Sequence, residues 1–291
     1  MVLNFNIFSY YTPKRIQSFL KPLQVARNLV WRYGARISYS PHVFVIGAPR
    51  SGTTLLFSIL AAHPSFAAIN NETYFFTFRD VFKLENYSRL SDFGGPSKKE
   101  FGELLSNSQD LVDFYDNVAK FMIERDGGSR FLEKSPIHTI YLGYLIKKFP
   151  NAKFINLIRD GRDCYVSYSR LPYCESIEKY AKRWRDSIRV RQKQGKNTQI
   201  IDVRYEDLVN QPEAITHKIM DFIGEKFYAH QVTTQGYSNP RIFNEHSGHE
   251  RLNKPIKANT VGKWREQLNP RQIDSFNKIA KKELKSLEYD I

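Results

Sequence analysis

Short apolar runs alternate with segments of helical periodicity along most of the chain. The runs lie at residues 43–46, 130–132, 153–158 and 199–203, and most of their residues are apolar. Runs of this length between turn signals are typical of buried strands. Because such strands alternate with helices, the pattern predicts an α/β fold of three layers, with a central parallel sheet flanked by helices on both faces.

Helices are expected between these strands and at the end of the chain. They fall at residues 55–60, 137–148, 160–168 and 177–193, and after Pro270. The last of them places five apolar side chains on one face: Ile273, Phe276, Ala280, Leu284 and Leu287. Residues 230–259 lack steady periodicity, and a long irregular segment in a compact domain is usually functional or disordered. We interpret it as a loop on the substrate side.

The N-terminal segment has a different pattern. Apolar residues recur near helical spacing over 14–37 with Lys and Arg around them, and Pro22 is expected to divide this stretch into two helical pieces. A basic amphipathic helix on an anionic membrane is one interpretation. A helix packed on the domain with a solvated basic face is the favoured alternative. We therefore predict a basic helical arm at 1–40 and a single domain at 41–291.

Charge and cysteine content narrow the class of protein. The net charge is +14, and residues 1–71 contain seven Lys or Arg and no Asp or Glu, which implies an acidic ligand or surface. The basic run at 179–196 is interpreted as a solvated helix face in preference to a polyanion groove. Two cysteines suit reduced thiols in a cytoplasmic protein. No signal peptide or membrane-spanning segment is expected.

The stretch GAPRSGTT, Gly47 to Thr54, resembles a phosphate-binding loop. It joins a predicted strand to a predicted helix, so backbone N–H groups and the positive end of a helix dipole would face an anion. The spacing of Gly47, Gly52 and Thr54 fits the P-loop pattern, but Thr53 occupies the lysine position. Arg50 instead offers a planar fork of donors inside the loop. An anion site is expected here.

Two further stretches carry candidate chemistry. In LIRDGRDCYVSYSR, Arg159 and Ser167 could bind a second anionic group, although an Asp160–Arg162 network that caps a helix explains the motif equally well. In RFLEKSPIHT, Lys134 could neutralise a leaving group, or could be an ordinary solvated lysine.

Glu72 could serve as a general base, or could be a simple charge at a helix start. His138 is a second possible base, but a lone His is more often structural. Residues 47–54, 134–138 and 159–163 all follow predicted strands, and ligands of such sheets bind at the carboxyl ends of strands. The spacing of His246, His249 and Glu250 is weak evidence for zinc, and no metal is expected.

The motifs GAPRSGTTLL, LIRDGRDCYVSYSR, VRYEDL and VGKWREQL occur in an order and spacing that resemble the PAPS-dependent sulfotransferases, in particular their bacterial members and the tyrosylprotein sulfotransferases. The resemblance covers residues 42–288. It implies a P-loop-like α/β fold and the cofactor 3′-phosphoadenosine 5′-phosphosulfate (PAPS), with 3′-phosphoadenosine 5′-phosphate (PAP) as its product and no metal.

The resemblance also implies roles for individual residues. Those expected to bind the 5′-phosphosulfate are Arg50, Ser51, Gly52, Thr53 and Thr54. Those expected around the 3′-phosphate and the nucleotide are Arg159, Ser167, Tyr205, Gly262 and Lys263. Lys134 and Arg50 would stabilise the departing phosphate. Glu72 would be the base, because Pro136 stands where cytosolic aryl sulfotransferases carry a histidine.

The predicted activity is transfer of a sulfuryl group from PAPS to an acceptor hydroxyl or amine. The acceptor class stays open among carbohydrate, lipid, small molecule and peptide, and the N-terminal arm could contact a membrane. Two alternatives remain. A P-loop kinase would need ATP and Mg²⁺, and Thr53 in the lysine position counts against it. A basic nucleic-acid-binding module would bind polynucleotide in a salt-sensitive way, but no nucleic-acid motif supports it.

Overall fold

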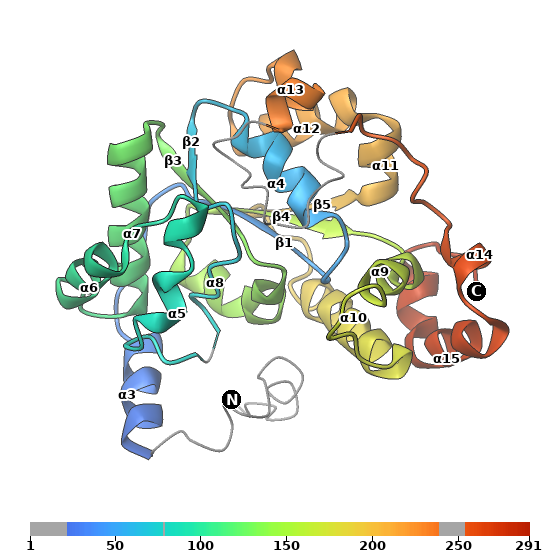
Figure 1. Ribbon diagram of the computed structural model, residues 1–291, viewed down its shortest axis with the longest axis horizontal. Helices are drawn as coiled ribbons and strands as arrows, with labels where there is room; N and C mark the ends of the chain where they lie inside the picture. Colours follow the sequence, from blue (N-terminus) through green and yellow to red (C-terminus); the bar gives the residue numbers. More distant parts are fainter. Residues whose placement is uncertain (1–21, 78, 239–253) are drawn as a thin grey trace.

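A five-stranded parallel sheet lies at the centre of the computed structural model, which describes residues 22–77, 79–238 and 254–291 (Figure 1). The spatial order is β2–β3–β1–β4–β5, and every neighbouring pair is parallel. The strands are β1 (Val43–Gly47), β2 (Phe66–Ala68), β3 (Arg130–Lys134), β4 (Lys153–Ile158) and β5 (Ile200–Arg204). Four of them match the predicted runs. The fifth, β2, has only three residues, too few for a periodic signal.

Helices cover both faces of the sheet (Figure 1). One set packs with Phe44 and Ile46 of β1: α5 (Glu85–Ser88), α6 (Lys98–Ser106), α7 (Leu111–Asp126) and α8 (Leu142–Lys148). A second set packs with Val43 and Val45: α4 (Thr53–Ala61), α11 (Tyr205–Asn210), α12 (Pro212–Ile223) and α13 (Thr234–Tyr237). Successive side chains of β1 thus enter the cores on opposite faces of the sheet, as expected because side chains alternate between the two faces along a strand. The predicted three-layer α/β fold is confirmed.

A third core joins the helices that follow β4 to the end of the chain. It contains α9 (Gly161–Tyr168), α10 (Ile177–Gln192), α14 (Trp264–Gln267) and α15 (Pro270–Ser286). Trp184 of α10 and Phe276 of α15 are fully buried, with ring centroids 5.8 Å apart. The predicted apolar face of the last helix is confirmed, because Phe276, Ala280 and Leu284 are buried.

The helix predicted from residue 137 begins as a 3₁₀ segment, η2 (Pro136–Tyr141), before α8. Thr139 explains part of this difference. Its hydroxyl donates to the carbonyls of Pro136 (2.8 Å) and Gly47 (3.1 Å) and accepts from the Gly47 N–H (2.8 Å). The bonds to Gly47 join segments that are far apart in sequence, so helical periodicity could not predict them. The described ranges also contain the 3₁₀ turns η1 (Ser91–Phe93) and η3 (Ala229–Val232).

The described part of the N-terminal arm packs on the domain. Helix α3 (Pro22–Arg32) places Trp31 against Phe82, with ring centroids 4.7 Å apart. Arg32 is buried and donates to the Thr77 carbonyl. On the other side, Val30 is 72% exposed. The helical piece predicted before Pro22 lies outside the described residues. No helix in the described ranges is long and apolar enough to cross a membrane.

The segment predicted to be irregular is only partly described. Its first part forms η3 and α13, short turns whose few residues carry no period. Residues 239–253, which include His246, His249 and Glu250, lie outside the described residues. Among the residues that are described, no group of three or more His, Cys, Asp or Glu side chains could hold a metal ion.

Candidate active site

The loop between β1 and α4 has the backbone of a tight anion-binding turn. Gly52 has a φ of +100°, and a Cβ there would lie 2.4 Å from the Tyr205 ring, so only glycine fits. Arg50 also has a positive φ, +67°, which is unfavourable for a residue with a side chain. Backbone strain of this kind is typical of ligand sites. The loop is therefore shaped by its contact with Tyr205 and is not a generic turn.

Some polar groups in this loop have no partner among the residues that the structure describes. The N-cap of α4 is Gly52, which has no side chain to cap the helix, so the first N–H groups of α4 are open to an anion. The Ser51 side chain is fully buried, and its Oγ has no hydrogen-bond partner within the described part of the chain. Buried polar atoms are usually satisfied in native proteins, so the Ser51 hydroxyl beside the N-terminus of α4 is available to hydrogen-bond an anion.

Arg159, at the end of β4, lies beside this loop. Its side chain stacks on the Tyr205 ring at 4.2 Å and donates to the carbonyls of Thr260 (2.7 Å) and Arg50 (3.4 Å). Arg159 is only 7% exposed, and its Nε has no partner among the described residues. A guanidinium held on three sides with one buried donor free can bind an anion without large rearrangement.

Arg50 and Ser167, which were assigned to different anionic groups, are in contact here. The Arg50 Nε donates to the Ser167 Oγ at 3.2 Å. Arg50 is exposed and Ser167 is half-buried. The ends of β1 and β4 thus bring both predicted anion sites to one edge of the sheet, as expected for adjacent parallel strands.

The segment 260–264 completes this side of the site. Asp163 of α9 accepts hydrogen bonds from the N–H groups of Gly262 (2.7 Å) and Trp264 (2.9 Å). Burial raises the pKa of Asp163, and these two N–H groups oppose that rise. The Tyr205 hydroxyl lies 2.8 Å from the Thr260 Oγ1. Tyr205 and Gly262 are therefore held near Arg159, whereas Lys263 pairs with Glu266 at 3.0 Å.

Arg162 has a structural role, although it is only three residues from Arg159. It is fully buried, stacks on Trp264 at 3.7 Å and donates to both carboxylate oxygens of Asp160. Asp160 also caps α9 by accepting from the Arg162 N–H at 2.9 Å. The capping network considered in the sequence thus describes Arg162. Arg159 is turned to the loop instead.

Glu72 and Lys134 come together at the carboxyl end of β3. The Lys134 Nζ lies 3.6 Å from the Glu72 Oε1, and the side chains are 6% and 29% exposed. Tyr74 also makes a side-chain hydrogen bond to Glu72. Burial raises the pKa of Tyr74, and the Glu72 charge raises it further, so the phenol stays protonated as a donor. The 61 residues from Thr73 to Glu133 separate this carboxylate–lysine pair in the sequence.

His138 does not face this pair. It is fully buried, its Nδ1 lies 2.9 Å from the Glu133 Oε2, and its Nε2 accepts from the Phe76 N–H at 3.3 Å. Both ring nitrogens are therefore used inside the protein. Of the two candidate bases, Glu72 has an accessible carboxylate and His138 has no free nitrogen.

Sequence reasoning missed several residues around the site, above all Glu133, Thr73, Ser135, Tyr74 and Asp163. One signal could have revealed Glu133. An acidic residue in the buried run RFLEK requires partners, because a buried carboxylate is costly unless it is hydrogen-bonded.

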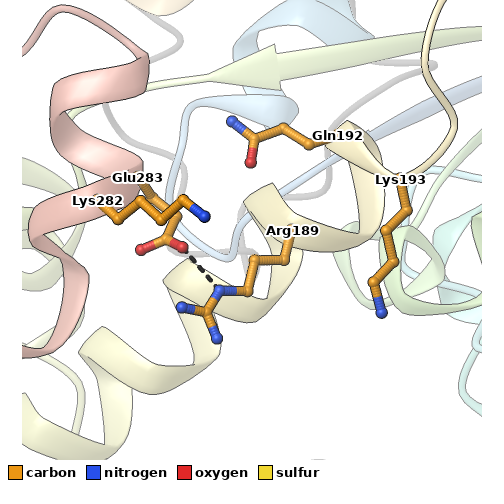
Figure 2. A pocket seen from close by; sticks show the side chains of 5 residues that line it. All are labelled: Arg189, Gln192, Lys193, Lys282 and Glu283. Carbon is orange, nitrogen blue, oxygen red and sulfur yellow. Dashed lines mark hydrogen bonds and ion pairs between the residues drawn. The ribbon is translucent and has the colours of Figure 1, made fainter.

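A surface hollow of about 340 Å³ lies elsewhere, between α10 and α15 (Figure 2). It is lined by Arg189, Gln192, Lys193, Lys282 and Glu283, none of which was predicted for the site. Arg189 is tied to Glu283 at 2.6 Å, and Arg191 pairs with Asp202 at 2.9 Å. Part of the basic run is thus neutralised, which fits the interpretation of a helix face.

The fold and these contacts define an α/β enzyme with a phosphate-type loop and an adjacent carboxylate–lysine pair. The model of the sulfotransferase family matches residues 41–229, and the chain belongs to that family. This match confirms the predicted resemblance to the PAPS-dependent sulfotransferases and the predicted class of enzyme.

Two curated relatives illustrate the similarity. The chain is 27% identical to protein-tyrosine sulfotransferase A of Caenorhabditis elegans over 86% of this chain and 68% of that protein. It is 26% identical to protein-tyrosine sulfotransferase of Drosophila melanogaster over 78% of this chain and 48% of that protein. The chain thus spans only about half the length of the second relative.

Solved structures support the fold. The sulfotransferase domain from the Synechococcus PCC 7002 olefin synthase has a TM-score of 0.67 at 23% identity, over 90% of this chain and 99% of that one. Mouse sulfotransferase SULT7A1, complexed with PAP, has a TM-score of 0.52 at 13% identity, over 90% and 91%. At this level of identity the likeness concerns the fold.

Proposed function

We propose that the protein transfers the sulfuryl group of PAPS to an acceptor hydroxyl, with Glu72 and Lys134 as the catalytic pair. The observation that carries the proposal is their 3.6 Å contact at the end of β3, beside the strand that ends in the β1–α4 loop. A carboxylate and a lysine at the edge where the loops gather are suited to moving a proton and stabilising developing charge.

The nucleotide fits the residues on the β1 and β4 side. The unpartnered Ser51 Oγ and the uncapped α4 suit the 5′-phosphosulfate, together with Arg50, Gly52, Thr53 and Thr54. Arg159, with its free buried Nε, and Ser167 suit the 3′-phosphate. The remaining contacts with the nucleotide are assigned to Tyr205, Gly262 and Lys263. PAPS, when bound, supplies the sulfuryl group that is transferred.

The chain's own residues divide the remaining work. Glu72 accepts the proton of the acceptor hydroxyl, and Tyr74 orients its carboxylate through their hydrogen bond. Lys134 and Arg50 stabilise negative charge on the phosphate side, since each is a cation next to the loop edge. Lys134 is almost fully buried, which makes its charge more effective than that of a solvated lysine.

For the acceptor, we infer a hydroxyl such as that of a tyrosine. The curated relatives in C. elegans and Drosophila are protein-tyrosine sulfotransferases, and this supports a phenolic hydroxyl over an amine. Carbohydrate, lipid and small-molecule hydroxyls are the alternatives that an assay must compare. Residues 230–259 are proposed to contribute to acceptor binding.

We also propose that the protein works in the cytoplasm next to an anionic membrane surface. Both cysteines are free, which suits a reducing compartment. Val30, Tyr33, Ile37 and Tyr39 are exposed around α3, and the first 71 residues carry no acid. Sedimentation with phosphatidylserine vesicles should exceed sedimentation with neutral phosphatidylcholine vesicles. Equal recovery with both would contradict the membrane contact.

A transfer assay tests the activity. Radiolabelled PAPS is incubated with a panel that contains a tyrosine peptide, an oligosaccharide, a lipid alcohol and a simple phenol. The proposal predicts labelled product from at least one hydroxyl acceptor, strongest with a phenol, and transfer that is about 10²- to 10⁴-fold slower with Glu72→Gln. Transfer that is equally fast with Glu72→Gln would remove Glu72 as the base.

A further inference from the structure

A buried polar cluster lies directly beneath the Glu72–Lys134 pair. Its members are Thr73, Glu133, Ser135 and His138, and each is at most 3% exposed. Thr73 follows Glu72 in sequence, and Lys134 stands between Glu133 and Ser135. The cluster therefore adjoins both members of the pair on the peptide chain.

Glu133 is the centre of the cluster. Its carboxylate accepts from the Thr73 hydroxyl at 2.6 Å, the Ser135 hydroxyl at 2.6 Å and the His138 Nδ1 at 2.9 Å. Three donors on two oxygens are what an ionised carboxylate needs when water is excluded. Burial raises the pKa of Glu133, but His138 and the two hydroxyls hold it below its ordinary value.

The same cluster holds the backbone that carries Glu72. The Ser135 Oγ accepts from the N–H groups of Thr73 (3.2 Å) and Tyr74 (3.5 Å). The His138 Nε2 accepts from the Phe76 N–H at 3.3 Å. Residues 73–76 are thus tied to the strand end at several points. Tyr74 also has a φ of +58°, a conformation that persists only where the surroundings enforce it.

We propose that Glu133 is a positioning residue that fixes the Glu72 carboxylate opposite the Lys134 ammonium through Thr73 and Ser135. Glu133 and Lys134 are consecutive residues of β3, so their side chains point to opposite sides of the strand. One strand end therefore presents Lys134 on one side and anchors the Glu72 loop on the other. The inference rests on the proposed function of Glu72 and Lys134.

The test compares single-atom changes at Thr73. Thr73→Val has the same shape but removes the hydroxyl that donates to Glu133, whereas Thr73→Ser keeps the hydroxyl. Thr216→Val is the matched control, because Thr216 is fully buried in α12 and its Oγ1 has no partner among the described residues. Ser135→Ala is a second variant that breaks the cluster from the other side. The readouts are kcat, acceptor KM, PAP affinity and Tm.

Thr73→Val is expected to lower kcat by about 10- to 100-fold, because a misplacement of about 1 Å can cost that much. PAP affinity should stay within about 2-fold, because the nucleotide site lies at β1 and β4. Thr73→Ser should recover most of kcat, and Thr216→Val should behave as wild type. Overturning results are a wild-type kcat in Thr73→Val, no rescue by serine, or a loss of kcat that only parallels a loss of PAP affinity.

Crystal structures of wild type and Thr73→Val with PAP give a readout that does not depend on turnover. The inference predicts that the Glu72 carboxylate moves away from the Lys134 Nζ in Thr73→Val. An unchanged contact would overturn it. If wild type binds PAP but sulfates no acceptor, the proposed activity fails, and the displacement of Glu72 still decides the positioning role.

Discussion

The proposed nucleotide side and the proposed acceptor side of the site differ in how their polar groups are satisfied. At the ends of β1 and β4, the Ser51 hydroxyl and the Arg159 Nε are buried without partners in the described chain. At the end of β3, Glu72 pairs with Lys134, and Glu133 receives three donors. The first region is built to be completed by a ligand. The second is organised before any ligand arrives.

This contrast makes binding and catalysis separable by mutation. Changes on the β1 and β4 side should weaken the nucleotide complex, and changes at β3 should slow transfer while the nucleotide still binds. The predictions below run from the largest expected effect to the smallest.

Glu72→Gln should have the largest effect. Loss of a general base is expected to lower kcat by about 10²- to 10⁴-fold. PAP affinity should change little, because Glu72 contacts Lys134 and Tyr74 and not the β1–α4 loop. Steady-state transfer kinetics and PAP titration measure the two effects. Glu103→Gln, on the exposed face of α6, is the matched control and should leave both unchanged.

Arg159→Ala should mainly weaken PAP binding and Arg162→Ala should mainly lower stability, although the two residues are close in sequence. Arg159→Ala is expected to weaken PAP binding by about 1.5–3 kcal/mol, the usual worth of hydrogen bonds to charged groups, with a small change in Tm. Arg162→Ala leaves Asp160 buried without its partner, so its main effect should be on stability, by about 3–5 kcal/mol.

Calorimetric titration and thermal unfolding separate these outcomes. Arg170→Ala serves as a control for Arg159→Ala, because Arg170 is exposed and bonds only Gln267 in the structure as described. Normal PAP affinity in folded Arg159→Ala protein would contradict its place at the 3′-phosphate.

Gly52→Ala should destabilise the loop and the fold together. The added Cβ would lie 2.4 Å from the Tyr205 ring at a φ that alanine disfavours, so we expect a loss of about 1–3 kcal/mol and weaker PAP binding. Gly224→Ala is the matched control for backbone strain alone, because Gly224 is also in the left-handed conformation, with a φ of +83°, and no atom lies within 4 Å of an added Cβ. Equal Tm losses for both would mean that the Tyr205 contact is unimportant.

The smallest effect concerns pH. The pKa of Glu133 in the folded protein lies below its ordinary value, so the stability that it contributes is present above about pH 4.3, the unfolded pKa. That stability is lost as the pH falls through the lower folded pKa. The charged or titratable group that faces Glu133 is His138, with Tyr115 nearby. The difference in unfolding free energy between wild type and Glu133→Gln should therefore shrink in acid.

Four of the strands and the phosphate-type loop could be predicted because their signals are local. The runs at β1, β3, β4 and β5 are continuous in sequence, and the glycines of GAPRSGTT have a fixed spacing. The hydrogen-bonded clusters around the site could not be predicted. The bonds of Thr73 to Glu133 and of Thr139 to Gly47 join residues 60 and 92 positions apart, and no periodicity encodes such pairs.

The two arginines of LIRDGRD show the limit most clearly. The sequence left two interpretations of this motif open, an anion site of Arg159 and Ser167 or an Asp160–Arg162 network that caps a helix. Burial separates them: Arg162 is enclosed by Asp160 and Trp264, whereas Arg159 keeps a free donor beside the loop. What distinguishes an arginine that is available to a ligand from a structural one is the set of neighbours supplied by distant parts of the chain.

Calorimetric titration of wild type and Glu72→Gln with PAP and with AMP, which lacks the 3′-phosphate, tests the central claim most directly. The account predicts that both proteins bind PAP with the same affinity and that binding of both collapses with AMP. Equal affinity for PAP and AMP would contradict the assignment of Arg159, and loss of PAP binding in Glu72→Gln would contradict the separation of the two sides.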